Sequence, residues 1–444
     1  MPAAAVISVL ARSLLAGEMA VDAVHGRAVR TLGRPWRWLQ PLAVRYVESF
    51  AAGLRPRHRE VVRFLRDDPG FRRAWVKYGH ELSIAEWVGE PPRMQPVTAA
   101  REWSIPAIKA VGDLAEWLSV SADELEWFAD LKALGNKLHN SKLQHYNYVV
   151  RPKRSGGVRL IEMPKSRMKE LQRRILTGIL DPIPVHTAVH GFVKGRSIVT
   201  FAAPHAAQSI LLRLDLQDFF PAFPAARVQA LFRTFGYPET VADRLGGICT
   251  NAVPRCVWSS RPLEIAAKEW HEARALYARP HLPQGAPTSP ALANLTAYRL
   301  DCRLTGLAKS AGAAYTRYAD DLAFSGGEDF ARVVERFAAH AAAVAIEEGF
   351  SLNHHKTRLM RQGVRQHLAG VVVNRKVNVP RRDLELLEAI LTNCVRLGPA
   401  SQNRDMLADF RAHLEGRVGF VEMVNRVQGA RLRHLLEAIQ WTGS

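Results

Sequence analysis

The chain has 444 residues, of which 48% are hydrophobic and 23% are charged. This balance excludes a mostly disordered chain, and the length allows two to three domains of roughly 150 residues each. Lys and Arg (61) outnumber Asp and Glu (42), which gives a net charge of +19 and makes nucleic acid the leading class of partner. No apolar stretch of about 20 residues is present to cross a bilayer, so we expect no membrane partner.

The four cysteines show neither the close pairing of a zinc site nor the density of a secreted disulfide scaffold. They are Cys249, Cys256, Cys302 and Cys394. The sequence therefore predicts a cytoplasmic protein.

Residues 1–90 have the pattern of helices separated by breakers at 33–35, 53–56 and 67–70. Aromatic residues alternate there with arginines. Such residues can stack bases and neutralise phosphates, but at helical spacing they more often form a core beside a solvated face. Both interpretations stay open, and the Pro-rich stretch 90–96 is typical of a linker.

The pattern is helical again over 105–137, where Ser121 and Glu124 form a possible capping box. Two strands, 146–150 and 158–163, are predicted to flank a basic turn and form a hairpin. A helix is predicted over 166–180, with Gln172, Arg173 and Arg174 mainly on its polar face.

Acidic residues end two predicted strand segments. The apolar run 209–215 ends in Asp215, and the predicted hairpin 314–325 carries Asp320 and Asp321 at its bend. Singly, such acids are typical of helix caps or solvated turns. Together they match a two-metal phosphoryl-transfer site, because two Mg²⁺ ions need hard oxygen ligands that converge from rigid elements.

Three segments resemble motifs of reverse transcriptases. Tyr318–Asp321 resembles their Tyr-x-Asp-Asp motif, Leu214–Phe220 resembles their first catalytic strand, and His281–Asn294 is similar to their Gln-Gly-x-x-x-Ser-Pro loop. The order and spacing of the three agree with that family. The resemblance implies an RNA-directed DNA polymerase.

By this resemblance, two Mg²⁺ ions are held by Asp215 and Asp320, with Asp321 as the assisting acid. Lys356 matches the lysine that protonates the leaving pyrophosphate, and a surface lysine is the alternative.

The resemblance also implies a set of residues that bind the incoming dNTP. Phe220 takes the place of the aromatic steric gate against a ribose 2′-OH, and Arg154 could exchange roles with the neighbouring lysine. The full set is Lys153, Arg159, Phe220, Gln284 and Gly285.

The segments 146–159, 171–176 and 190–198 resemble the fingers of bacterial retron-type enzymes. That likeness implies a structured non-coding RNA as template and primer, an RNA–DNA hybrid, and a single-stranded DNA product linked to RNA (msDNA). It also implies a role in antiviral defence with a possible effector protein. The alternatives are a defence-associated or group II intron-like reverse transcriptase, and a non-catalytic RNA-binding scaffold that restrains an effector.

Two segments depart from the retron pattern. Phe201–His205 replaces Asn-Ala-x-x-His, and Leu368–Gly370 replaces Val-Thr-Gly. Both motifs are associated with recognition of the retron's own RNA. His205 is therefore a candidate RNA contact and equally a candidate core residue. The candidates for phosphate contact in the thumb are Arg381, Arg382 and Arg417.

The fold class that follows is α+β, a right-hand polymerase with an N-terminal helical extension. We expect the extension at 1–100, the fingers at 101–205, the palm with its catalytic carboxylates at 206–374 and a helical thumb at 375–444.

Overall fold

The computed structural model describes residues 3–50, 56–89, 93–135, 144–153 and 156–441. Its backbone forms two compact units. Unit 1 comprises 1–132 with 229–247, and unit 2 comprises 133–228 with 248–444. Both helices and strands are present, as expected for an α+β fold. Within the described residues, no helix is both long and apolar enough to span a membrane.

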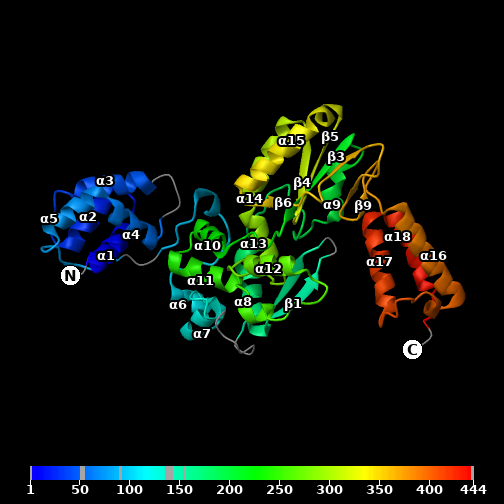
Figure 1. Ribbon diagram of the computed structural model, residues 1–444, viewed down its shortest axis with the longest axis horizontal. Helices are drawn as coiled ribbons and strands as arrows, with labels where there is room; N and C mark the ends of the chain where they lie inside the picture. The colour runs from blue at the N-terminus through cyan, green and yellow to red at the C-terminus, as the bar shows by residue number, and fades with distance from the viewer. Residues whose placement is uncertain (1–2, 51–55, 90–92, 136–143, 154–155, 442–444) are drawn as a thin grey trace. The chain divides into compact units, whose positions relative to one another are not determined.

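Five helices open unit 1 and share one hydrophobic core. They are α1 (Ala3–Leu15), α2 (Val21–Leu32), α3 (Leu39–Phe50), α4 (His58–Asp67) and α5 (Pro69–Tyr78) (Figure 1). The predicted breakers end them for local reasons: Gly33 closes α2 in the left-handed conformation, and the Asp68 side chain caps α5 by accepting from the backbone N–H of Phe71 at 2.6 Å. The breaker 53–56 lies mainly outside the described residues.

Further along unit 1, α6 (Val111–Leu118) and α7 (Ala122–Ala129) confirm the helical pattern over 105–137. The Ser121 hydroxyl accepts from the backbone N–H of Glu124, and the Glu124 carboxylate accepts from the N–H of Ser121. The predicted capping box is therefore present.

Unit 2 begins with the predicted hairpin, in which β1 (Tyr146–Pro152) pairs antiparallel with β2 (Val158–Pro164). It continues into α8 (Ser166–Ile175) and one π turn, η4 (Leu176–Leu180). One expectation was wrong here. Gln172 is fully buried rather than on the polar face, because its amide donates to the Tyr146 hydroxyl and to the carbonyl of Ile248.

A five-stranded antiparallel sheet forms the centre of unit 2. The strands β4 (Ala314–Tyr318), β5 (Asp321–Gly326), β3 (Ile210–Gln217) and β6 (Ser351–Leu352) lie in this order, and β7 (Arg358–Arg361) also pairs with β3. The predicted strand 209–215 and hairpin 314–325 are thus confirmed.

Helices cover both faces of this sheet. Phe324 of β5 packs on Phe337 of α15 (Glu328–Glu347), whereas its neighbour Ala323 packs in the cluster that contains Phe201 of α9 (Ile198–Ala202). Successive strand residues point to opposite faces, so these contacts identify the two layers (Figure 1). Burial on both sides explains why the first part of β3 is an almost continuous apolar run.

Three helices end unit 2 around a core of their own: α16 (Arg381–Leu397), α17 (Phe410–Val424) and α18 (Arg426–Glu437). The remaining elements connect these parts. They are η1 (Thr98–Ala100), η5 (Ala203–His205), α10 (Ala225–Thr234), α11 (Glu239–Cys249), η6 (Arg255–Trp258), α12 (Ala267–Leu276), α13 (Ser289–Thr296), α14 (Tyr298–Ser310), β8 (His367–Leu368), β9 (Val371–Val372) and η7 (Pro399–Ser401).

The compact units do not follow the expected boundaries of extension, fingers, palm and thumb, because unit 1 also takes residues 229–247. The four-part division remains a prediction.

Candidate active site

Strand pairing brings the three predicted acidic residues to one edge of the sheet. Asp215 of β3 lies opposite Asp321, the first residue of β5. The backbone N–H of Leu216 donates to the carbonyl of Asp320 at 2.9 Å, so Asp320 also lies beside β3. All three belong to unit 2: Asp215 and Asp321 lie on the paired strands β3 and β5, and Asp320 lies in the turn between β4 and β5.

The bend that presents Asp320 is sterically tight. Ala319 has a φ of 53°, in the left-handed region that non-glycine residues seldom adopt. Gly191 packs directly on this bend, where an added Cβ would lie 2.6 Å from the Ala319 nitrogen. A side chain at position 191 would therefore displace the bend and the acids it carries.

The carboxylates form a crowded group of like charges, in which Asp215 is buried and Asp320 and Asp321 are half-buried. Burial, and then the charges of Asp321 and Asp215, raise the pKa of Asp320 to about 6. Burial also raises the pKa of Asp321, although the neighbouring Arg213 opposes this. A cation between these groups would relieve the repulsion, which is the physical requirement of a metal site.

Two cationic side chains already contact the acids. The Arg213 guanidinium donates to Asp321 Oδ1 from Nε at 2.8 Å and from Nη2 at 2.6 Å. Lys356 Nζ donates to both carboxylate oxygens of Asp215, at 3.1 and 3.0 Å. The three carboxylates supply the hard oxygen ligands that Mg²⁺ prefers. Among the described residues, however, no three Asp, Glu, His or Cys side chains are arranged as a ready-made metal site.

Arg213 was missed by the sequence reasoning. A signal was available, since residues two apart on a strand share a face and Arg213 stands two residues before Asp215.

Phe220, the expected steric gate, is half-buried in the turn after β3. Its ring centroid lies 6.3 Å from that of Phe192, an exposed residue at a φ of 60°. Phe192 in turn lies 6.4 Å from Tyr318. The aromatic group beside the acids thus contains Phe192, which was not predicted.

The predicted loop with Gln284 and Gly285 lies against the hairpin. The Gln284 carbonyl accepts from the backbone N–H of Glu162 on β2 at 2.8 Å. Gly285 has a φ of 130°, and an added Cβ would lie 2.7 Å from the Glu162 carbonyl oxygen. Only glycine allows the two backbones to approach this closely.

A buried polar network anchors the same contact. Glu162 is fully buried, with Oε1 2.9 Å from His281 Nε2, and its Oε2 accepts from Asn251 Nδ2 at 2.7 Å. Asn251 also donates to the Tyr148 hydroxyl, and His281 Nδ1 lies 2.6 Å from the carbonyl of Arg279. No sequence motif marked Glu162, because its partners are distant along the chain.

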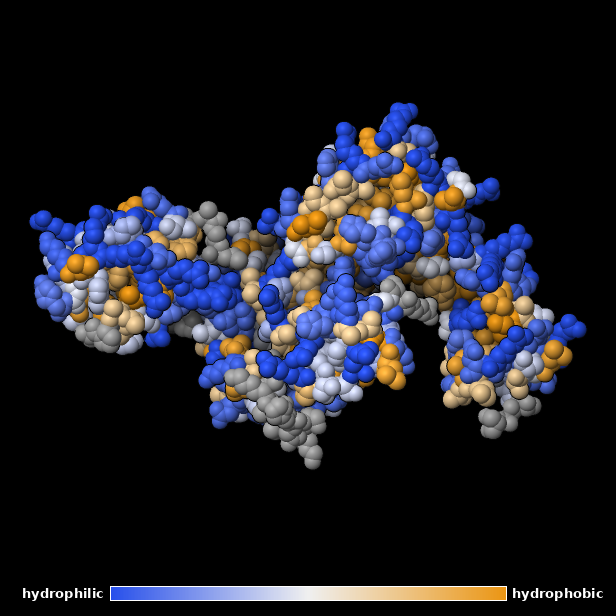
Figure 2. All heavy atoms as spheres, in the orientation of Figure 1, coloured by the Kyte–Doolittle hydropathy of each residue, from blue (hydrophilic) through white to orange (hydrophobic). Residues whose placement is uncertain are grey.

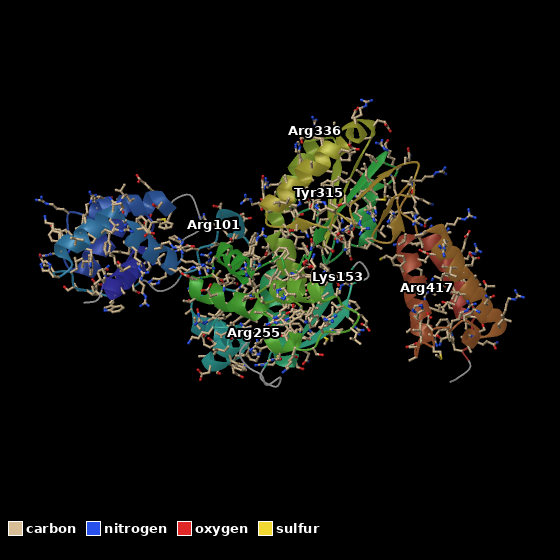
Figure 3. The ribbon with its side chains drawn as sticks, in the orientation of Figure 1. Arg101, Lys153, Arg255, Tyr315, Arg336 and Arg417 are labelled. Atoms are coloured by element: carbon tan, nitrogen blue, oxygen red, sulfur yellow. The ribbon has the colours of Figure 1, made fainter. Side chains whose placement is uncertain are left out.

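The cationic candidates of the hairpin have different surroundings. Lys153 Nζ donates to Asp218 Oδ1 at 2.8 Å, whereas Arg159 is exposed on β2. Figure 3 labels Lys153 at the end of β1. Arg154 lies outside the described residues.

The expectation that His205 contacts RNA is wrong. Its ring is fully buried, with Nδ1 2.6 Å from the Ser325 hydroxyl and Nε2 2.7 Å from the Thr316 hydroxyl. Burial lowers the pKa of His205 to about 3. Both ring nitrogens thus have partners inside the protein, and His205 is a core residue.

The three arginines that were expected to contact phosphate from a thumb are not equivalent. Arg381 and Arg382 are exposed at the start of α16, and Arg381 Nε donates to Glu385 at 2.7 Å. Arg417 (Figure 3) is half-buried in a groove of about 560 Å³ between α16 and α17.

Comparison with known proteins assigns the family. Residues 151–380, more than half of the chain, match the model of "Reverse transcriptase (RNA-dependent DNA polymerase)". This region contains all three acids and the Gln284 loop.

Curated proteins narrow the assignment. The chain is 40% identical to the retron Mx65 reverse transcriptase of Myxococcus xanthus over 74% of this chain and 72% of that protein. It is 33% identical to the retron Mx162 enzyme of the same organism, over 78% and 70% of the two chains. Identity to the retron Ec86 enzyme of Escherichia coli is 27%, over 75% and 90%. The expected retron type and RNA-directed DNA polymerase activity are confirmed, and the chain belongs to the reverse transcriptase family as a member of the retron type.

Proposed function

We propose that this enzyme copies part of a structured non-coding RNA into single-stranded DNA that stays linked to the RNA, by two-metal nucleotidyl transfer. The observation that carries the proposal is the pairing of Asp215 with Asp321 at one sheet edge, beside Asp320 with its raised pKa. The product would serve antiviral defence, and an effector protein as partner stays a prediction.

In this proposal, the Asp215, Asp320 and Asp321 carboxylates hold two Mg²⁺ ions. The bound ions would lower the pKa of the attacking hydroxyl and stabilise charge on the transferred phosphoryl group. Lys356, which contacts Asp215, would donate a proton to the departing pyrophosphate. Arg213 holds the Asp321 carboxylate in one orientation.

The dNTP would lie beside the contact between the hairpin and the Gln284 loop. Lys153 and Arg159 supply positive charge for the triphosphate, and exposed Gly285 lets the loop backbone approach the nucleotide. Phe220 supplies the surface that a ribose 2′-OH would strike. Lys153 must exchange its bond to Asp218 for phosphate oxygens when the nucleotide binds.

A right-hand arrangement would place the RNA–DNA hybrid along fingers, palm and thumb. Arg381, Arg382 and Arg417 are the proposed phosphate contacts of the thumb. Arg417 has the weaker case, because it is half-buried.

Priming is the part of the proposal that rests most on the retron type. An RNA 2′-OH at an internal guanosine can attack in place of a 3′-OH, because RNA alone offers that group within a strand. The attacking oxygen must lie within about 3–3.5 Å of the α-phosphorus, so one RNA fold must dock tightly.

The test is to isolate DNA from cells that express the protein and treat it with ribonuclease and with a debranching enzyme. One DNA species with an RNA stub that debranching removes is the expected result. DNA with a free or protein-linked 5′ end would instead move the assignment to another defence-associated reverse transcriptase.

A further inference from the structure

A groove between α3 and α5 in the N-terminal bundle combines aromatic rings with unpaired cations. Its volume is about 280 Å³, and it is lined by Trp38, Arg45, Arg73, Lys77 and Tyr78 among others. It lies outside residues 151–380, so the family match assigns no role to it. We call these five residues the basic-aromatic groove.

The rings of the groove are supported from behind by the bundle core. Trp38 meets Phe71 edge-on, with centroids 5.6 Å apart, and Tyr78 packs 5.0 Å from Trp36. Both Trp38 and Tyr78 remain half-buried, so part of each ring is open to solvent. Rings held in this way lose little conformational entropy when a planar group stacks on them.

The cations of the groove are free to bind an anion. Arg73 and Lys77 stand four residues apart on α5 and both are exposed. Lys77 Nζ lies 5.1 Å from the centroid of the Tyr78 ring, but within the described chain neither cation has an ion-pair partner. By contrast, their neighbour Arg72 pairs with Asp67 at 3.2 Å, and Arg45 pairs with Asp68 at 2.6 Å.

The positive charge of the surrounding segment favours a polyanion as the ligand of the groove. Residues 1–89 carry 14 Lys and Arg against 8 Asp and Glu, a net charge of +6. Figure 2 shows hydrophilic atoms interrupted by hydrophobic ones over the N-terminal helices. The carboxylates of an acidic peptide would pair with the cations but would not stack on the rings. An unpaired nucleotide can do both, because its phosphate pairs with a cation and its base stacks on a ring.

We propose that the basic-aromatic groove binds unpaired nucleotides of the RNA on which this enzyme acts. A base stacks on Trp38 or Tyr78, and flanking phosphates pair with Arg73 and Lys77. Base stacking of this kind requires single-stranded RNA, because bases in an A-form duplex are already stacked on each other.

The full-length protein tests this with a labelled 12-nucleotide single-stranded RNA and the matching RNA duplex as probes. Arg73→Glu with Lys77→Glu should raise the Kd for the single strand at least tenfold. It should also reduce the steepness of the plot of log K against log salt concentration by about 1.4, because each phosphate contact of a single strand contributes about 0.7 to the slope. The control is Arg63→Glu with Arg66→Glu, which makes the same charge change at exposed sites on α4.

Stacking is tested separately from charge. Trp38→Leu should weaken single-strand binding roughly tenfold with an unchanged salt slope, and Trp38→Phe should retain most of the binding. A 4-thiouridine probe should cross-link to α3 or α5. Melting temperatures equal to wild type would show that each variant is folded.

The proposal is overturned if both double charge reversals weaken binding equally, since the groove charges would then act only as general background. It is also overturned if duplex and single strand respond alike, or if cross-links avoid α3 and α5.

Discussion

At the level of single residues, the local motifs were predictable and their partners were not. The motifs that contain Asp215, Asp320 and Asp321 are short and can be recognised directly in the sequence. Strand pairing brings these residues together as expected. Arg213 and Glu162 have partners 108 and 119 positions away, so no local motif identifies these contacts, although the place of Arg213 two residues before Asp215 on one strand was a usable signal. His205 was ambiguous for a related reason, because the sequence does not reveal whether a histidine is buried.

Phe220 is predicted to set sugar selectivity. Phe220→Ala should open space for a ribose 2′-OH and raise the kcat/KM for rNTPs relative to dNTPs by roughly tenfold or more. Single-nucleotide incorporation kinetics with matched dNTP and rNTP measure this. Phe330→Leu, a change at a buried phenylalanine of α15 that packs on Phe337, should leave the ratio unchanged.

His205 is predicted to make stability fall in mild acid. Its pKa is about 3 in the fold against an ordinary value of 6.5, so it contributes stability above pH 6.5 that is lost as the pH falls toward 3. From pH 7 to pH 5 the loss is about 2 kcal/mol. His205→Gln should therefore show a smaller drop in melting temperature over this range than wild type. An equal drop would contradict the assignment.

At the level of elements, the hairpins could be predicted because each is a local structure. The β1–β2 pair flanks a basic turn, and the β4–β5 pair consists of two short apolar or aromatic runs with adjacent acids at the bend. The helix over 166–180 was placed correctly, but Gln172 turned inward to satisfy Tyr146 and Ile248, a tertiary contact that helical periodicity cannot reveal.

The Glu162 network is predicted to hold the Gln284 loop against the hairpin. Glu162→Ala would leave His281 and Asn251 without their buried partner, at a cost of about 1–3 kcal/mol in stability. Because β2 also supports the loop backbone, the KM for dNTP should rise more than kcat falls. Glu162→Gln retains the hydrogen-bonding capacity and should restore most of the KM.

Steady-state kinetics and thermal melting measure the two effects. The exposed Glu170→Ala on α8 serves as the control. A lower melting temperature with an unaltered KM would mean that the network serves stability alone.

At the level of the whole molecule, the net charge predicted a nucleic-acid partner, because it is a total that does not depend on contacts. The division into two compact units was not predictable in the same way. Residues 229–247 join unit 1 although they lie more than ninety residues beyond its first segment, which ends at Lys132. Such a crossover depends on tertiary packing.

The net charge of +19 predicts binding that weakens steeply with salt. Each phosphate contact should contribute about 0.7–0.9 to the slope of log K against log salt. Titration of an RNA–DNA hybrid at several salt concentrations measures the slope, and Arg382→Gln should lower it by about one contact. Affinity independent of salt would mean that the charge is only a compositional bias.

The central claim is that Asp320, with Asp215 and Asp321, forms the catalytic centre, and the most direct measurement is primer extension by Asp320→Asn in the presence of Mg²⁺. This change keeps the side-chain volume and removes the charge. We predict a loss of kcat/KM of at least about 100-fold, roughly 2.7 kcal/mol of transition-state stabilisation, with hybrid affinity retained. The exposed Asp329→Asn should behave as wild type. Undiminished dNTP incorporation by Asp320→Asn would contradict the account.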